Sequence, residues 1–407
     1  MVDRQPREQL SKEVLVVAVE ASADLHGAAV LRELKALAPD LTFFGSAGPL
    51  MRAEGCEALV RAETLGVMGL VEVLPAIPRL LAALKTLATA AEQRKPQGAL
   101  LIDSPDFNLR LAKKLKRLRI PAAYFIGPSV WAWRTYRVKQ IARDVRRMLV
   151  ILPFEQAFYA QHYVAATYVG NPLADRLALR PDRLAQNQGN ALEIDSLARS
   201  ERKRFLGLDS IKPVLALLPG SRRQEIQKHW RPMLEAAALL LKKDPNLQLA
   251  VPVAPTIDRE TLQTVATDLQ MPVTFLAGRA PELLSACDAA VVASGTATLE
   301  AALQLCPMVV VYRMSWLSYF IARLLVRVKF IALPNLLAQR ALVPELIQGN
   351  CNAKEIARRI GHLLENYEER NQMREGLRVL RDEVAPVGAP NVARSVAKEL
   401  LAVLGRS

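Results

Sequence analysis

Two carboxylates follow an apolar run in the segment GALLIDSPDF. The run from Ala99 to Ile102 predicts a buried strand of a parallel sheet, and Asp103 and Asp106 come directly after it with a proline between them. In open parallel sheets, ligands bind beyond the carboxyl ends of the strands. Asp106 is therefore a candidate functional acid, whereas Asp103 is either a second functional acid or the N-cap of the next helix.

A phosphate-binding turn is indicated by LLPGSRRQEI, which follows another apolar run. Gly220 would allow backbone N–H groups to approach an oxyanion, and Arg222 and the helix N-terminus would add positive potential. The lysine and the spacing of a P-loop are absent. The alternative is a tight turn that binds no ligand.

A second turn of this kind is ASGTATLEAAL. Thr296 and Thr298 could bond a phosphate or cap the helix that begins there. Glu300 could accept hydrogen bonds from ribose hydroxyls, or it could simply suit the positive end of the helix dipole. Next to a phosphate turn, the ligand-binding interpretation is favoured.

Two loops of the N-terminal half carry further candidates. In VEASADLHG, Glu20, Ser22 and Asp24 could face a ligand or only cap a helix, and the missing GxGxxG fingerprint argues against a nicotinamide oxidoreductase. In GPSVWAWR, Trp131 and Arg134 could line a cleft or lie at a bilayer surface, with core packing as the alternative for the tryptophan.

These motifs lie on alternating strand-like and helix-like segments, which predict an α/β fold with two Rossmann-like parallel-sheet domains. A ligand cleft is expected between the domains. The expected first domain is 1–176, and the polar stretch 177–211 is expected to be a linker or surface insertion. The expected second domain is 212–364, and the terminal helical segment from about 365 to 407 is expected to pack back near the first.

The chain has a net charge of +14, and the window from Ala76 to Arg147 alone has sixteen Lys or Arg against four acids. Such a surface attracts phosphates of nucleic acid, anionic lipid or a substrate, unless it is only a solvated helix face. The four cysteines and four histidines are scattered and lack metal-ligand spacing. Buried thiols in a reducing compartment are the simplest interpretation of the cysteines.

Two apolar segments, VMGLVEVLPAIPRLLAALKTL and SWLSYFIARLLVRVKFIALP, could dip into a membrane interface or form core helices. Neither is long enough without charges to span a bilayer. The polar N-terminus lacks the apolar core of a signal peptide. The expected location is therefore cytoplasmic or peripheral to a membrane.

Taken together, the motifs resemble those of the lipid-A-disaccharide synthase family. They occur in the family's order and cover most of the chain outside the polar stretch and the termini. The matching segments are VEASADLHGA, FFGSAGPLMRAEGCEAL, LGVMGLVEVL, IDSPDFN, PSVWAWR, ILPFEQAFY, VGNPLAD, LLPGSRRQEI, ASGTATLEAAL, PMVVVYRM and LPNLLA.

The resemblance implies a GT-B glycosyltransferase that inverts the configuration at the anomeric carbon. The implied reaction joins UDP-2,3-diacylglucosamine to 2,3-diacylglucosamine 1-phosphate (lipid X) and releases lipid A disaccharide 1-phosphate and UDP. No cofactor and no metal are expected. The implied location is the cytoplasmic face of the inner membrane, with an anionic membrane surface as a partner, no nucleic acid, and a homodimer allowed.

The resemblance also assigns roles to residues. Asp106 matches the position proposed for the base that deprotonates the acceptor hydroxyl. The donor would contact a set drawn from both halves of the chain: Glu20, Ser22, Gly220, Ser221, Arg222, Gly295, Thr296, Glu300 and Asn335. The acceptor or its acyl chains would contact Val67, Met68, Leu70, Val71, Trp131 and Arg134.

Three positions depart from the family pattern. Val19 and Ala23 replace the two glycines usual in the first loop, so this loop is expected to differ slightly if those glycines adopt positive φ. Asn171 stands where a histidine is usual, so no catalytic histidine can act there.

Two other functions remain open at this stage. One is a sister GT-B enzyme acting on UDP-N-acetylglucosamine, such as a peptidoglycan transferase or the non-hydrolysing 2-epimerase. The other is a basic protein that binds nucleic acid or a lipid surface without catalysis.

Overall fold

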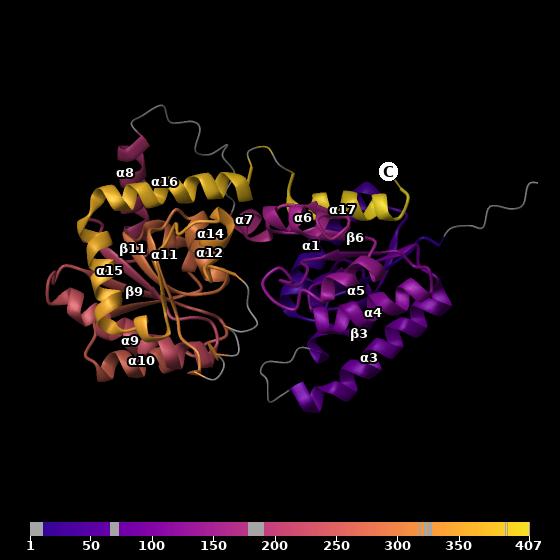
Figure 1. Ribbon diagram of the computed structural model, residues 1–407, viewed down its shortest axis with the longest axis horizontal. Helices are drawn as coiled ribbons and strands as arrows, with labels where there is room; N and C mark the ends of the chain where they lie inside the picture. Colours follow the sequence, from indigo (N-terminus) through magenta and orange to yellow (C-terminus); the bar gives the residue numbers. More distant parts are fainter. Residues whose placement is uncertain are drawn as a thin grey trace, which may run out of the picture. The chain divides into compact units, whose positions relative to one another are not determined.

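The computed structural model describes residues 11–65, 73–177, 191–316, 319–320, 323, 328–386, 388 and 390–406, which form two compact units (Figure 1). The first unit comprises two stretches of the chain, Met1–Asp175 and Gly388–Ser407. The second unit comprises Arg176–Val387. Each unit contains one parallel sheet with helices around it, so both are Rossmann-like α/β units as the sequence predicted.

The first unit has a seven-stranded sheet in the order β3-β2-β1-β4-β5-β6-β7. Its strands are β1 (Glu13–Val17), β2 (Thr42–Ala47), β3 (Glu57–Arg61), β4 (Gly98–Ile102), β5 (Ala122–Phe125), β6 (Arg147–Val150) and β7 (Ala166–Tyr168). Its helices are α1 (Ala21–Leu37), α2 (Pro49–Ala53), α3 (Val73–Arg94), α4 (Pro105–Arg117), α5 (Arg137–Asp144), α6 (Pro153–Ala160), α7 (Pro172–Arg176, ending at the boundary) and α17 (Val392–Val403).

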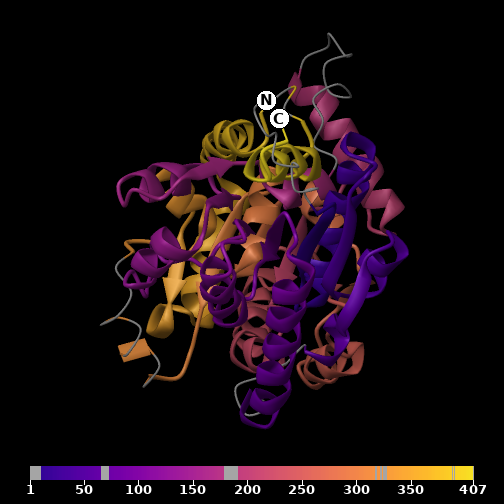
Figure 2. The ribbon, with the colours of Figure 1, turned by 90° about the vertical axis from the view of Figure 1, so that its right-hand side faces the viewer.

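The first sheet is covered on both faces, which explains why its central strands β1 and β4 are nearly continuous apolar runs. In β1, Leu15 and Val17 enter the core beneath α3, α4 and α5, whereas Val14 and Val16 enter the core beneath α1 and α17. Successive side chains of a strand point to opposite faces, so a strand buried on both sides needs a continuous apolar run. Figures 1 and 2 show α17, in yellow, and α3 on opposite sides of this sheet.

The second unit has a six-stranded sheet in the order β10-β9-β8-β11-β12-β13. Its strands are β8 (Val214–Leu218), β9 (Gln248–Val253), β10 (Val273–Ala277), β11 (Ala289–Ala293), β12 (Met308–Tyr312) and β13 (Glu345–Ile347). Its helices are α8 (Ala191–Phe205), α9 (Arg223–Leu241), α10 (Arg259–Asp268), α11 (Ala280–Ala286), α12 (Thr296–Leu303), α14 (Leu333–Ala338), α15 (Ala353–Glu365) and α16 (Tyr367–Val384).

The structure shifts two expected boundaries. Helix α8, within the stretch expected to be a linker or insertion, packs against α11, and its buried Lys203 is held by Asp288 at 2.8 Å. Helix α16 packs against α12 and α14, so the chain returns to the first unit only with α17, which packs against α1. Buried apolar side chains such as Leu377 of α16 and Val396 of α17 decide these assignments.

All four cysteines lie buried as free thiols, as the sequence suggested. Within the described ranges, the search for a helix with the length and hydropathy of a membrane span found none.

Candidate active site

Both sheets have a topological switch point, where the strand order reverses beside the first strand of the sheet. In the first unit this point lies between β1 and β4, which pair directly. In the second it lies between β8 and β11, which also pair directly. Because ligands of doubly wound folds bind beyond the carboxyl ends of the strands at this point, the turns that leave β1 and β4 are the candidate site of the first unit, and those that leave β8 and β11 are the candidate site of the second. They are the turns that the sequence singled out.

The turn between β4 and α4 has an unusual backbone. Asp103 and Ser104 have φ of 51° and 46°, a left-handed conformation that residues with a side chain rarely adopt. The side chain of Asn108 donates to the carbonyl of Asp103 at 2.8 Å, and the hydroxyl of Tyr124 donates to the same carbonyl at 2.6 Å. These buried bonds hold the strained turn in place and fix the direction in which α4 leaves the sheet.

The structure separates the two acids of this turn. Ser104, not Asp103, occupies the N-cap position of α4, and its side chain makes no capping hydrogen bond. The Asp103 carboxyl is partly buried, and burial raises its pKa. Asp106 lies in the first turn of α4 and points outward, with 73% of its side chain exposed.

Two arginines contact the Asp106 carboxylate, and both approach the same oxygen. Arg137 of α5 donates to Oδ1, and Arg134 lies 3.7 Å from Oδ1. Oδ2 has no hydrogen-bond partner among the described residues. The arginines can thus orient the carboxylate while one oxygen stays available to accept a proton.

The loop between β5 and α5 holds Arg134 through its neighbours. Trp131 donates from Nε1 to Oε1 of Glu155 at 3.1 Å and packs edge-on against Phe154 at 5.0 Å between ring centroids. Arg134 has a φ of 55° and its guanidinium stacks on Trp133 at 4.1 Å. The contacts of Trp131 therefore anchor the loop between β5 and α5 to α6. Arg134, further along the same loop, lies beside Asp106.

Glu155 is the buried anchor of this loop. Its carboxylate accepts from Trp131 and also from the backbone N–H of Leu152 at 3.1 Å. Burial raises the pKa of Glu155 to about 7, although both donors act in the opposite direction. Deprotonation near neutral pH would therefore place a charge beneath the Trp131 loop.

The loop after β1 contains both exposed and structural polar residues. Glu20 and Ser22 are exposed at the start of α1, where a ligand could reach them. Asp24 is buried and accepts from the backbone N–H groups of Gly48, Leu50 and Met51 at 2.9 to 3.0 Å. It thereby caps α2, a different helix from α1, to which it belongs, and is unavailable to a ligand.

The positions that depart from the family pattern have structural roles. Val19 and Ala23 are buried, and neither has a positive φ. Asn171 is also buried: its Nδ2 donates to the carbonyl of Ile151 at 3.1 Å, and its Oδ1 accepts from the N–H of Leu173 at 3.0 Å. Asn171 thus ties the end of β6 to the start of α7.

The turn after β8 has the backbone that a phosphate turn needs. Gly220 has a φ of 118°, and a Cβ there would lie 2.4 Å from the Glu225 carboxylate, so only glycine fits. The N–H groups of Ser221 and Arg222 donate to Oε2 of Glu225 at 3.0 and 3.3 Å. An internal carboxylate thus occupies these two donors. The side chain of Arg222 is 84% exposed, and its guanidinium lies 3.7 Å from Oε1 of the same Glu225, a solvent-exposed ion pair that a phosphate could replace.

The buried side chain of His229 makes two hydrogen bonds, one of which holds the turn after β8. Nε2 of His229 accepts from the backbone N–H of Arg313 at 2.9 Å, and Nδ1 lies 3.2 Å from the carbonyl of Pro219. An acceptor at Nε2 requires the proton to be on Nδ1, which then donates to Pro219. Burial lowers the pKa of His229 and favours this neutral ring. The residue thereby connects the turn after β8 to the end of β12.

The turn after β11 exposes its glycine and first threonine. Gly295 has a φ of 153° and open space where a Cβ would lie, and Thr296 is exposed beside it. Thr298 is buried and bonds the Gly295 carbonyl at 2.7 Å. Glu300 is partly buried and pairs with Arg176 at 3.1 Å; burial raises its pKa and Arg176 opposes that shift.

Asn335 is completely buried in the second unit. It donates to the Val343 carbonyl and to Glu345 at 2.8 Å, and its Oδ1 accepts from the N–H groups of Leu342 and Val343 at 2.7 and 2.8 Å. Its hydrogen-bonding groups are all used by the segment that leads from α14 into β13. It can therefore influence a nucleotide by shaping the backbone, and a direct contact would require it to leave this network.

The structure adds four residues that the sequence argument did not select: Arg137, Glu155, Glu225 and His229. Glu225 had a local signal, because an acid three residues after the N-cap typically caps a helix. The others become visible only through contacts that are distant in sequence. Val67, Met68, Leu70 and Val71 lie outside the described residues. In the described part of the chain, no group of three or more His, Cys, Asp or Glu side chains could hold a metal ion.

Comparisons with solved structures show the class of fold. The UDP-N-acetylglucosamine 2-epimerase of Neisseria meningitidis, bound to UDP-N-acetylglucosamine, superposes with a TM-score of 0.59 at 14% identity, over 97% of this chain and all of the other. The calicheamicin glycosyltransferase CalG4 superposes with a TM-score of 0.55 at 16% identity, over 97% and 98% of the two chains. The fold is that of GT-B enzymes.

Comparisons of sequence give the family. The family model described as lipid-A-disaccharide synthetase matches residues 14–387. A lipid-A-disaccharide synthase of Anaeromyxobacter sp. strain K is 46% identical over 97% of this chain and 98% of its own length. One of Myxococcus xanthus strain DK1622 is 47% identical over 95% and 97%. The chain therefore belongs to the lipid-A-disaccharide synthase family.

Proposed function

We propose that this chain transfers 2,3-diacylglucosamine from UDP to the 6-hydroxyl of 2,3-diacylglucosamine 1-phosphate, forming lipid A disaccharide 1-phosphate and UDP. The observation that carries the proposal is family membership over nearly the whole chain, together with an exposed carboxylate at the switch point of the first sheet. The α-linked donor and the β-linked product require inversion in a single displacement.

Asp106 is the proposed base. The acceptor oxygen attacks the anomeric carbon of the donor, the bond from that carbon to UDP breaks, and UDP leaves with the bonding electrons. The hydroxyl proton passes to Oδ2 of Asp106, the oxygen that the arginines leave free. Arg137 and Arg134 are positioning residues in this scheme, because they orient the carboxylate through Oδ1.

The second unit supplies the proposed donor site. Arg222, Gly220 and Ser221 would stabilise the charge that develops on UDP, and Glu225 would have to release the Ser221 N–H for that group to take part. Gly295 and Thr296 form the neighbouring exposed turn, and Glu300 could meet the ribose. Asn335 would act by holding its loop, while Glu20 and Ser22 of the first unit would complete the site.

The proposed acceptor site uses Arg134, which lies 3.7 Å from the Asp106 carboxylate, and Trp131, which is anchored to Glu155 in the same loop. The segment from Val67 to Leu81 would hold acyl chains. Because both substrates are lipids, the chain would work at the cytoplasmic face of the inner membrane against anionic lipid. A homodimer is compatible with this scheme.

A direct test uses purified protein, UDP-2,3-diacylglucosamine and the monosaccharide 1-phosphate in detergent micelles, with a chelator present and no metal added. Mass spectrometry should find the disaccharide 1-phosphate and UDP in equal amounts. Product under these conditions establishes the reaction and its independence from added metal. Product that appears only after metal is restored would overturn the metal-free scheme and retain the transferase activity.

The epimerase is the competing function, because UDP-N-acetylglucosamine 2-epimerases share this fold. The same protein is therefore incubated with UDP-N-acetylglucosamine alone, and its 2-epimer is sought by chromatography. Epimer without any disaccharide would replace the proposed function. Disaccharide without epimer would exclude the competitor.

A further inference from the structure

The two helical layers of the first sheet differ in charge. Helices α3, α4, α5 and α6 on one face carry eleven Lys or Arg and four acids, a net of +7. Helices α1, α2 and α17 on the other face carry five Lys or Arg and three acids, a net of +2. Eleven of the sixteen cations of the basic window therefore lie on one helical layer of the folded unit, and a solvated surface with no partner does not require such an imbalance.

Helix α4 concentrates this charge on its exposed side. Phe107, Leu111 and Leu115 turn toward the core, while the exposed side carries, in order, Asp106, Arg110, Lys113, Lys114 and Arg117. Spacings of three and four residues place these side chains along one stripe of the helix. The four cations have no ion-pair partner among the described residues. A cationic stripe thus begins beside Asp106 and runs the length of α4, about 20 Å at 1.5 Å per residue.

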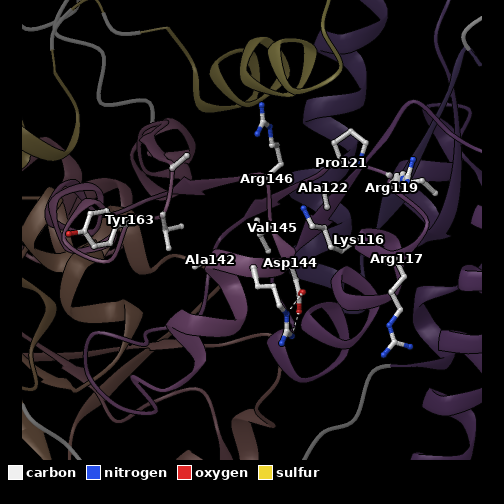
Figure 3. Close-up of a pocket in the computed structure, with 14 residues that line it drawn as sticks. Lys116, Arg117, Arg119, Pro121, Ala122, Ala142, Asp144, Val145, Arg146 and Tyr163 are labelled. Atoms are coloured by element: carbon white, nitrogen blue, oxygen red, sulfur yellow. Dashed lines mark hydrogen bonds and ion pairs between the residues drawn. The ribbon is translucent and has the colours of Figure 1, made fainter.

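The stripe ends at a pocket of about 660 Å³ at the edge of the sheet opposite to Asp106. The pocket is lined by the end of α4, the start of β5, the end of α5 and the turn at Tyr163 (Figure 3). Its cations are Lys116, Arg117, Arg119, Arg143 and Arg146.

Only one of the five cations is neutralised. Asp144, the sole acid of the lining, is buried and bonded twice by Arg143 at 2.7 Å. The other four are exposed and have no ion-pair partner in the described ranges. Helix C-termini favour nearby cations, which accounts for Lys116 and Arg117, but Arg119 and Arg146 belong to the loops before β5 and β6. Cations from separate elements therefore converge on one concave site.

We propose that this pocket binds the phosphate headgroup of an anionic phospholipid and anchors the first unit on a membrane through the α4 face. Several cations around one cavity match a phosphate, which accepts several charge-assisted hydrogen bonds. Tyr163, 98% exposed at the rim, suits the interfacial region of a bilayer. On the neighbouring α3, Ile77 and Leu81 are exposed apolar side chains on the same face.

The proposal rests on the proposed function for its choice of a lipid, because an enzyme that joins two lipid substrates must work where lipids are. The new inference specifies which face of the first unit contacts the membrane, and how α4 is oriented on it. With α4 lying along the headgroups, the Asp106 end of the helix and the pocket meet the same lipid surface. A lipid phosphate is favoured over a soluble one because the cationic stripe continues well beyond the pocket.

The test is co-sedimentation with vesicles, measured without substrates so that it does not depend on the reaction. The pocket variant combines Lys116→Ala, Arg117→Ala, Arg119→Ala and Arg146→Ala. The matched control removes four exposed cations from the second unit, Lys242→Ala, Lys243→Ala, Lys354→Ala and Arg359→Ala. The vesicles contain phosphatidylcholine with or without phosphatidylglycerol. Two controls confirm that each variant is folded: thermal unfolding, and the turnover rate with both substrates in detergent micelles.

The pocket variant should bind phosphatidylglycerol vesicles about tenfold more weakly or worse, since each surface cation contributes substantially to binding anionic membranes. The control should stay within about threefold of wild type, and no protein should bind phosphatidylcholine alone. Unchanged binding by the pocket variant would overturn the proposal. So would unchanged vesicle binding combined with loss of affinity for glycerol 3-phosphate, because the pocket would then serve a soluble phosphate.

A second measurement keeps all the charges of the pocket and covers the case of a misfolded pocket variant. All four native cysteines are buried, so a new exposed cysteine can be labelled selectively. Ala142→Cys lines the pocket, and Lys398→Cys lies on α17 of the opposite face. A polarity-sensitive dye should respond to phosphatidylglycerol vesicles at position 142 and not at position 398. An equal response, or one at 398 alone, would exclude the proposed orientation.

Discussion

The two switch points have the same arrangement of strands and different chemistry. Beside β1 and β4 of the first unit, an exposed carboxylate is contacted by two arginines on one oxygen. Beside β8 and β11 of the second, two glycines with positive φ form turns, and an internal carboxylate occupies two of the available N–H groups. The backbone topology thus provides the location in both units, and the side chains are the reason why we propose proton transfer at the first switch point and anion binding at the second.

Asp106→Asn should give the largest effect, because it removes the proposed base and keeps the size of the side chain. The turnover rate should fall by a factor of about 10² to 10⁴. UDP affinity, measured by calorimetry, should stay within about twofold, since donor binding is assigned to the other unit. Loss of UDP affinity with little loss of turnover would make Asp106 a donor ligand and remove the contrast between the two switch points.

Glu155→Gln should change how stability depends on pH. Burial raises the pKa of Glu155 from 4.5 to about 7, so the folded state binds more protons than the unfolded state between these values. Ionisation therefore costs stability as the pH rises through this window, by about 3 kcal/mol in the wild type. The variant cannot ionise there and should lack this loss.

The measurement is urea unfolding at about pH 5 and about pH 8, followed by tryptophan fluorescence. The exposed Glu201→Gln is the matched control and should keep the wild-type dependence. Parallel pH profiles for wild type and Glu155→Gln would show that this carboxyl is not the buried acid that the geometry indicates.

Arg222→Ala should weaken UDP binding by about tenfold to a hundredfold, the range expected for a hydrogen bond to a charged group. Thermal stability should hardly change, because the side chain is exposed. The adjacent, exposed Arg223→Ala is the control and should leave the affinity near that of wild type. If both variants bind UDP equally well, the turn after β8 is only a helix cap.

His229→Gln should have the smallest effect, a loss of about 1 to 2 kcal/mol of unfolding free energy from imperfect replacement of two buried hydrogen bonds. Burial lowers the pKa of His229, so the unfolded chain binds the proton first and stability falls as the pH drops through the ordinary value of 6.5. The variant should lose this acid-side dependence. If the unfolding free energy of the variant falls with decreasing pH as it does in the wild type, other groups cause that fall.

Much of the fold could be predicted from local pattern. The apolar runs of β1, β4, β8 and β11 indicated buried parallel strands, and all of them occur. The bounds around α8 and α16 could not be predicted, because a polar amphipathic segment shows that it can be a helix but not which core it covers. Packing against α11, α12 and α14 made that choice.

The candidate site divides in the same way. The sequence alone determined which residues could do chemistry, since glycines in turns, a proline-flanked acid and an arginine after a strand are local features that steric and charge rules make readable. It also supported the family resemblance. It could not show that Asp24 and Asn335 are buried and fully bonded, because their partners lie outside the helices to which these two residues belong.

Only the tertiary structure decided which oxygen of Asp106 is free, which carboxylate occupies the turn after β8, and that most of the basic window forms one face with a pocket at its end. The physical reason is the separation along the chain of the groups that interact. A helix, a strand or a turn is set by neighbours along the chain, whereas the pairing and burial of a charged side chain depend on groups that packing brings together from distant segments.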